Sequence, residues 1–308
     1  MRKAVKADKE SILNIWAQCF AADSKYQGIL SAADYPLLDT YVHEANGQVV
    51  SILTLLPIKW NGNGEVRNGH YVYGVATLPQ YRGKGYSTLL MKQVLAELKE
   101  QGSDFAVLYP AEPELQEFYQ KQGFVSCGKQ LEIEADEELQ ENWLDNADDF
   151  SDNDWELQPI ESGKEYQQFR DEFLEKSCKN NDGYFSWTAE HYAFNHNEAA
   201  YSSGGLCKIT QNDEVKALAA CWVQDGNGWE QGKIIIKEML FAEDDAKEAA
   251  LSMLAEFAGG KSLVFCQPAW EKENSLGEVE EVNFGMINWL NPERKVDFTE
   301  SYLALVLD

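Results

Sequence analysis

The chain carries one pattern of predicted secondary structure twice, and this repetition limits the possible folds more than any other feature. Residues 69–110 and residues 232–268 each predict a strand, a connection, an amphipathic helix, a glycine and a second strand, in that order. Strands that alternate with helices in this way are typical of a mixed α/β domain. A unit that recurs along one chain indicates an internal duplication. We therefore expect two α/β domains in tandem, each built on a mixed sheet.

The segments around the two repeats also correspond. The first half opens with a strand and an amphipathic helix, and a hairpin follows around the turn-forming pair Asn46 and Gly47. The second half opens with a strand and a helix over residues 155–178, and a hairpin follows over residues 204–224. A last strand of the first half is predicted near residues 127–134. The order of elements is therefore the same in both halves.

A strongly acidic segment separates the halves, and we expect part of it to pack as a helix. Since 308 residues exceed the usual size of one domain, two domains are expected. The predicted boundaries are residues 1–135 for the first domain, 136–154 for an acidic linker and 155–308 for the second domain.

Composition restricts the partners. The net charge of −26 repels polyanions, so no nucleic-acid partner is expected, whereas a cationic substrate is compatible. An acidic surface also keeps a protein in solution without selecting any partner. The six cysteines lack the spacing of a zinc site, and His191 and His196 are five residues apart, which does not suit one helical face. We expect free thiols, no metal, no membrane span, no signal peptide and a cytoplasmic location.

The connection in the first repeat, QYRGKGYS over residues 80–87, has the composition of an anion site. Glycines at 83 and 85 let oxygens approach the main chain at a predicted helix start, where N–H groups are unpaired, and Arg82 and Lys84 add positive charge. A dinucleotide fingerprint would need a small residue at Thr88, and a Walker A loop would need Ser or Thr after Lys84. An exposed basic turn without a ligand is the remaining alternative.

The corresponding connection in the second repeat reads AEDDAK, with three acids and no glycine. A phosphate would meet like charge there. The duplication therefore predicts one retained site, in the first half, and one lost site, in the second.

The pattern Q-x-x-G-x-G at residues 80–85, followed by FYQKQGF at 118–124, resembles the GNAT acetyltransferase superfamily over about residues 1–134. Two tandem copies with a degenerate second one resemble its enhanced-intracellular-survival-type branch. The resemblance implies that acetyl-CoA binds the first domain. The implied contacts with the pantetheine arm and the pyrophosphate involve Val75, Ala76, Thr77, Gln80, Tyr81, Arg82, Gly83, Lys84, Gly85, Tyr86, Ser87 and Thr88.

The resemblance also implies two catalytic groups. Tyr119 occupies the position of a general acid, and a phenol with a pKa near 10 is well matched to a departing thiolate; alternatively, its ring packs the short helix against the sheet. Asp308 would bring its two carboxyl groups into the pocket if the C-terminus points there, or it ends an ordinary edge strand. Glu112 and Glu114 are candidate bases on sequence grounds only. The asparagine that often follows the second central strand is absent here.

The leading hypothesis is an N-acetyltransferase that moves the acetyl group of acetyl-CoA to a primary amine of a small cationic molecule or a peptide, by direct transfer in a ternary complex. A tRNA-dependent aminoacyl transferase is an alternative, but the net charge of −26 suits tRNA poorly. A non-catalytic acyl-CoA sensor is the second alternative. Oligomerisation is possible under each hypothesis.

Overall fold

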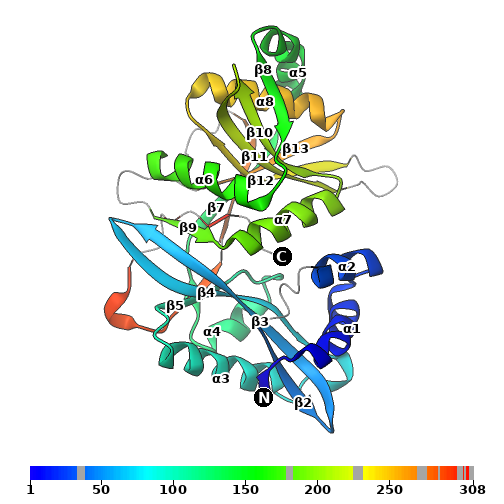
Figure 1. Cartoon of the computed structure of the whole chain (residues 1–308), viewed down its shortest axis with the longest axis vertical. Coiled ribbons are helices and arrows are strands. Elements are labelled where there is room, and N and C mark those ends of the chain that lie inside the picture. The colour runs from blue at the N-terminus through cyan, green and yellow to red at the C-terminus, as the bar shows by residue number, and fades with distance from the viewer. Residues whose placement is uncertain are drawn as a thin grey trace.

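The computed structural model describes residues 1–32, 39–177, 183–224, 232–268, 276–283, 285–296, 301, 303 and 304. These residues form two mixed sheets with helices on both sides of each sheet (Figure 1). The first sheet has the order β1 (Arg2–Lys3), β2 (Thr40–Ala45), β3 (Gln48–Gly62), β4 (Glu65–Thr77), β5 (Phe105–Leu108), β15 (Met286–Trp289) and β6 (Val125–Ser126). The short strand β9 (Tyr184–Trp187) extends it by pairing with the far end of β3.

The second sheet has the order β14 (Gly277–Asn283), β7 (Lys129–Ala135), β13 (Ser262–Pro268), β12 (Lys233–Phe241), β11 (Glu214–Gln224), β10 (Gly205–Gln211) and β8 (Trp155–Pro159). In each sheet the strand before the amphipathic helix pairs in parallel with the strand after it, β4 with β5 and β12 with β13. Because the other pairs are antiparallel, both sheets are mixed, as expected. The predicted turn at Asn46 and Gly47 is also present, and both residues have positive φ angles, 54° and 76°.

Helices cover the sheets in layers. Helices α3 (Tyr86–Glu100) and α4 (Leu115–Gln120) pack on the outer face of the first sheet, and α5 (Glu137–Asp152) and α8 (Asp244–Ala258) on the outer face of the second. Between the sheets lie α6 (Gly163–Ser177) and α7 (Ala189–Tyr201), as Figure 1 shows, and α1 (Lys9–Phe20) and α2 (Ser24–Ala32) contribute to the same side of the first sheet. No helix among the described residues is long and apolar enough to cross a membrane.

Side chains alternate between the two faces of the first sheet. Leu53 and Leu55 of β3 pack with α3, whereas Ile52 and Leu56 pack with α1. The core that contains α1 continues without a break into residues of the second half, such as Tyr192 on α7. One hydrophobic core is therefore shared by the two sheets.

The two sheets exchange strands, which corrects one detail of the sequence analysis. The predicted last strand of the first half, near residues 127–134, is mostly β7, and it pairs with β13 and β14 in the second sheet. In the first sheet its place beside β5 is taken by β15. All four residues of β5 are buried, so this central strand requires a partner on each edge.

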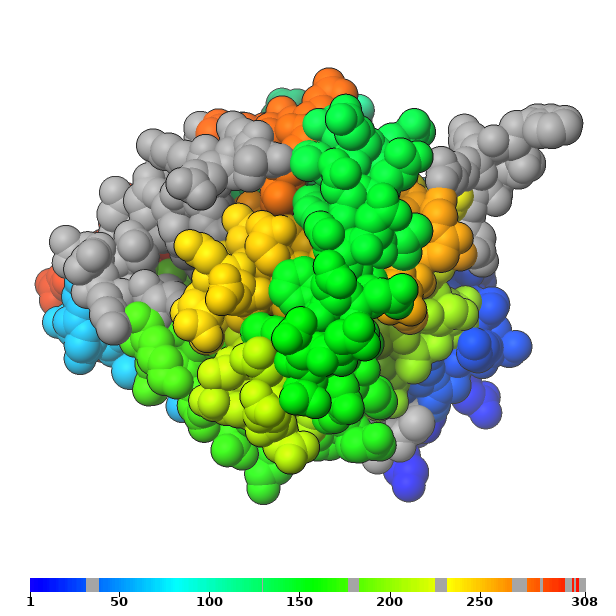
Figure 2. All heavy atoms as spheres, turned by 90° about the horizontal axis from the view of Figure 1, so that it is seen from above, coloured from blue at the N-terminus to red at the C-terminus, as the bar shows by residue number. Residues whose placement is uncertain are grey.

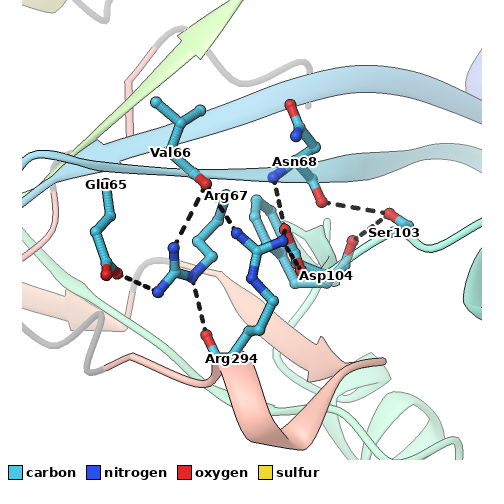
Figure 3. A network of polar contacts seen from close by, with 8 residues as sticks. Glu65, Val66, Arg67, Asn68, Ser103, Asp104 and Arg294 are labelled. Atoms are coloured by element: carbon cyan, nitrogen blue, oxygen red, sulfur yellow. Dashed lines mark hydrogen bonds and ion pairs between the residues drawn. The ribbon is translucent and has the colours of Figure 1, made fainter.

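A polar network fixes the segment that follows the C-terminal end of β15 (Figure 3). The Asp104 carboxylate is buried; it accepts a hydrogen bond from the Asn68 N–H at 3.0 Å and pairs with the Arg294 guanidinium at 2.9 Å. The Asp104 carbonyl accepts the N–H groups of Leu290 and Asn291. The segment after β15 is thereby bound to the start of β5.

The acidic segment predicted as a linker over 136–154 is largely helix α5. Trp143 of α5 is buried and packs edge-on against Phe265 of β13, with ring centroids 6.2 Å apart. Seen from above, residues of α5 and β8 form the green band across the middle of the molecule in Figure 2. The acidic side chains of α5 are exposed on the outer face of the second sheet.

Candidate active site

The loop between β4 and α3 has the backbone that its sequence predicts for an anion site. Gly83 and Gly85 have φ angles of +76° and +78°, in the left-handed region that favours glycine. A Cβ atom at either position would meet no atom within 4 Å, so open space lies in front of the main chain. Gly85 is the N-cap of the 15-residue helix α3, and no described side chain caps this end. The helix start therefore presents uncapped N–H groups and the positive end of the helix dipole.

The side chains of this loop are held by nearby groups. Arg82 is exposed, and its Nε donates a hydrogen bond to the Thr77 carbonyl at 3.1 Å, which closes the turn. The Lys84 ammonium lies 4.9 Å from the centre of the Tyr81 ring. Tyr86 stacks on His43 at 4.6 Å. Ser87 and Thr88, the next residues of α3, are half-buried, whereas Gln80 is exposed. The loop thus has a defined conformation with two exposed cations.

Strands β4 and β5 separate beside this loop. Their parallel pairing covers only Gly69–Tyr71 of β4, although β4 continues to Thr77. The register between β3 and β4 shifts near Gly74, whose φ angle is +58°. A Cβ atom at Gly74 would lie 2.7 Å from the Trp16 ring, so glycine is required here for close approach as well. Beyond Tyr71, the β4 edge that faces away from β3 is not paired with β5, and such an edge can bind an extended chain that carries amides.

The three residues predicted on this edge differ in their contacts. Val75 is half-buried and lines the cavity described below. The carbonyl of Ala76 accepts the Ser51 hydroxyl at 2.8 Å, and the carbonyl of Thr77 accepts Arg82. Of the three, Val75 is the one that lines this cavity.

A cavity of about 480 Å³ opens at the point where the strands separate. Its walls come from α1, α2, β4 and α4 of the first half and from α7, β11 and β12 of the second half. Aromatic rings dominate the lining: Trp16, Phe20, Tyr26, Tyr71, Tyr73, Tyr109, Tyr119, Tyr201 and Trp222. Three charged side chains also line it: Asp23, Glu198 and Lys237. Both halves of the chain therefore build the cavity.

Tyr119 lies in this wall and packs in the core as well. It is 7% exposed, and its ring makes edge contacts with Phe118 and Phe124. Burial raises the pKa of Tyr119 to about 12, above the value near 10 used in the sequence analysis. The phenol is therefore neutral across the physiological range and keeps a proton to donate. The pKa of the Tyr119 phenol then matches that of the departing thiol, as predicted, only if the same apolar site also raises the pKa of the thiol.

The structure does not bring the two candidate bases together with Tyr119. Glu112 and Glu114 are exposed and do not line the cavity, so their prediction as bases is not supported. Asp308 lies outside the described residues. Nearby tail residues are attached to the first sheet: the Trp60 indole donates to the Ser301 hydroxyl, and the Trp187 indole donates to the Ala304 carbonyl, both at 2.9 Å.

The corresponding connection of the second half differs as its sequence predicts. Glu243 is the N-cap of α8, and Asp244 and Asp245 form its first turn. These carboxylates already occupy the positive end of the helix, so the start of α8 repels a phosphate. Among the described residues, no group of three or more His, Cys, Asp or Glu side chains is arranged to hold a metal ion.

Residues 1–126 match the family model of the acetyltransferase (GNAT) domain. Over these residues the chain is similar to a GNAT acetyltransferase domain. Among solved structures, the chain is similar to a GCN5-related N-acetyltransferase from Anabaena variabilis, with a TM-score of 0.71 and 17% identity over 94% of this chain and 72% of that one. No curated protein sequence matches the chain.

Two further solved structures share the fold of this chain. A probable N-acyltransferase from Enterococcus faecalis has a TM-score of 0.72 and 17% identity, over 94% of this chain and 71% of that one. Eis1 from Mycobacterium abscessus has a TM-score of 0.65 and 12% identity, over 94% and 73%. Because these single chains cover both halves, they confirm the predicted fold class, a mixed α/β fold with two tandem GNAT-like domains.

The contribution of the second half to the cavity was not predicted from the sequence. Glu198, Tyr201 and Trp222 are far from the motif along the chain, and nothing in their local pattern indicates a site. Tyr71 and Tyr73 carried a weak signal, since their alternation in the strand YVYG places both rings on one face.

Proposed function

We propose that the protein is an acetyl-CoA-dependent N-acetyltransferase that transfers the acetyl group directly to a primary amine in a ternary complex. The observation that supports this most strongly is the loop with two left-handed glycines at the start of α3, beside the separated ends of β4 and β5. A diphosphate and an extended amide chain are the two chemical features that this pair of sites accommodates.

The described residues could hold both the pyrophosphate and the pantetheine arm of acetyl-CoA. Residues 80–88 would hold the pyrophosphate through main-chain N–H groups at the start of α3, with Arg82 and Lys84 adding charge. Residues 75–77 would hold the pantetheine amides along β4. When bound, acetyl-CoA supplies a thioester carbonyl that an amine can attack. Because the start of α8 carries acids where α3 carries glycines, we expect one binding site per chain.

Tyr119 is our proposed general acid, since it lines the cavity and stays protonated at physiological pH. Its hydroxyl would donate a proton to the departing thiolate of coenzyme A. The attacking amine must lose its own proton before or during transfer. Asp308 remains our candidate carboxylate for that step on the basis of the resemblance alone.

We infer that the acceptor is a small cationic amine or an amine of a peptide. The net charge of −26 disfavours tRNA and is compatible with a cation. The aromatic lining of the cavity is compatible with the same class, because aromatic faces attract ammonium groups.

The test is an acceptor screen that measures the release of free thiol at saturating acetyl-CoA, together with calorimetry of acetyl-CoA binding. We expect one equivalent of acetyl-CoA per chain and turnover with at least one cationic primary amine. Two equivalents would contradict the single site. Tight binding without turnover for every amine would favour the sensor alternative.

A further inference from the structure

The second half contributes a carboxylate to the wall of the cavity. Glu198 lies on α7, and the hydroxyl of Tyr26 on α2 donates a hydrogen bond to its Oε1 at 2.6 Å. The hydroxyls of Tyr26 and Tyr73 are 3.5 Å apart, so Tyr73 of β4 lies next to this pair. Helices α2 and α7 are in contact. Glu198 thus approaches the β4 strand from the opposite half of the chain.

Aromatic rings surround this carboxylate. Tyr26 packs edge-on against Tyr201, with centroids 5.5 Å apart, and Trp16 lies 5.2 Å from Tyr73. Burial raises the pKa of Tyr73 well above its ordinary value, and the charge of Glu198 contributes to this shift. Ring faces attract cations and give little stabilisation to an anion, so a partly buried carboxylate among them favours a positively charged ligand.

Two other charged side chains line the cavity, and each of them contacts other residues of its wall. Asp23 lies at the start of α2, where it accepts the Tyr26 N–H at 2.7 Å and the Tyr201 hydroxyl at 3.1 Å. The Lys237 ammonium lies 4.8 Å from the centre of the Trp222 ring. Asp23 is exposed, whereas Glu198 is half-buried. Of the two carboxylates in the cavity wall, Glu198 is therefore the one that the aromatic rings shield from solvent.

We propose that Glu198 binds the ammonium group of the acceptor, so that the degenerate half selects cationic amines for the acetyl-CoA site of the first half. Tyr26 is a positioning residue, because its hydroxyl holds one carboxylate oxygen and its ring forms part of the wall. This inference rests on the proposed function, since the acceptor must share the cavity with the thioester.

The substitution Glu198→Gln tests the proposal because it removes the charge and keeps an oxygen that accepts the Tyr26 hydroxyl. A charge-assisted hydrogen bond corresponds to a factor of about ten or more in affinity. We expect KM for cationic amines to rise by about that factor, with little change in kcat or in the Kd for acetyl-CoA. An aryl hydrazide, which is uncharged at neutral pH, should react equally well with both proteins.

A matched control is available on the same helix. Glu190 of α7 is exposed, so Glu190→Gln removes an equal charge outside the cavity and should leave KM unchanged. Glu198→Asp keeps the charge and should retain part of the affinity, which separates lost charge from lost packing. Thermal melting of each variant verifies that the fold is intact.

A second measurement separates this inference from the proposed function. Calorimetry with hexylammonium, using 1-hexanol as the neutral probe, needs no turnover. We expect wild type to bind hexylammonium more tightly than Glu198→Gln does, even if no acceptor is ever acetylated. Unchanged KM and unchanged probe affinity in Glu198→Gln, an equal loss in Glu190→Gln, or no binding of hexylammonium to wild type would overturn the proposal.

Discussion

At the scale of single residues, Tyr119 is the general acid of the proposed mechanism. Tyr119→Phe preserves the ring contacts with Phe118 and Phe124 and removes only the hydroxyl. Turnover should fall roughly 10²–10⁴-fold, the usual effect of losing a positioned general acid. The Kd for acetyl-CoA should barely change, because the hydroxyl acts mainly in the transition state.

Tyr41→Phe is the control for this substitution. Tyr41 belongs to the same core cluster, and its hydroxyl donates to Glu97 on α3 at 2.7 Å, away from the cavity. Tyr41→Phe should retain full turnover. An unchanged rate in Tyr119→Phe would show that the proton comes from another group. Since the pKa of Tyr119 is about 12, its ionisation should also cause no loss of activity near pH 10.

The residues that could be predicted from the sequence are those that a local pattern identifies. Gly83, Gly85 and Tyr119 each stand in a short motif, and the structure places them at a helix start or in the cavity wall. Glu198 and Tyr26 meet only because two helices far apart in the chain pack together. Such a contact depends on the tertiary fold, so no local pattern could reveal it.

At the scale of elements, the turn into α3 is the part that most directly tests cofactor binding. Gly83→Asp or Gly85→Asp places a side chain and a negative charge where phosphate oxygens must approach, so acetyl-CoA binding should be lost. Gly102→Asp is the matched control: Gly102 also has a positive φ, +81°, and open space around it, but lies just beyond the other end of α3.

A residue with a Cβ atom costs about 1–2 kcal/mol of backbone energy in the left-handed region. This cost of replacing glycine should be similar in all three variants. Calorimetry with acetyl-CoA, together with thermal melting, distinguishes this cost from a loss of binding. If Gly102→Asp loses binding to the same extent as Gly83→Asp, or if Gly83→Asp binds normally, the loop is not the phosphate site.

Elements with a strong period and the two hairpins were predicted well, whereas the sheet that β7 and β15 each join was not. Leu90, Val94 and Leu98 of α3 are all buried, as their spacing predicts. By contrast, β7 joins the second sheet and β15 joins the first. A short apolar run such as β15 carries no information on which sheet it enters, because any buried edge offers the same hydrogen bonds.

At the scale of the whole molecule, the two halves depend on one another. The first sheet contains β9 and β15 from the second half, and one core joins α1 to α7. We therefore expect a fragment of residues 1–128 to lack a cooperative unfolding transition and to bind acetyl-CoA far more weakly than the full chain. Thermal melting by circular dichroism and calorimetry measure both properties. A fragment that melts cooperatively and binds acetyl-CoA as the full chain does would refute this expectation.

The large negative charge is also understood best at this scale. The acidic helix α5 packs on the outer face of the second sheet, whereas the cavity lies on its inner side, next to the shared core. Charges separated by more than about 10 Å are largely screened at physiological ionic strength. We therefore expect the α5 carboxylates to contribute less to the proposed selection of the acceptor than groups within the cavity, such as Glu198.

The pairing of β15 with β5 has a consequence for biosynthesis. A chain emerges from the ribosome N-terminus first, and domains usually begin to fold as they emerge. Here the strand that completes the first sheet is translated long after β5, since Met286 pairs with Leu108. The edge of β5 that β15 covers therefore stays unpaired until β15 has emerged from the ribosome. We expect nascent chains to require chaperone protection during this interval, and prematurely terminated chains to be aggregation-prone and inactive.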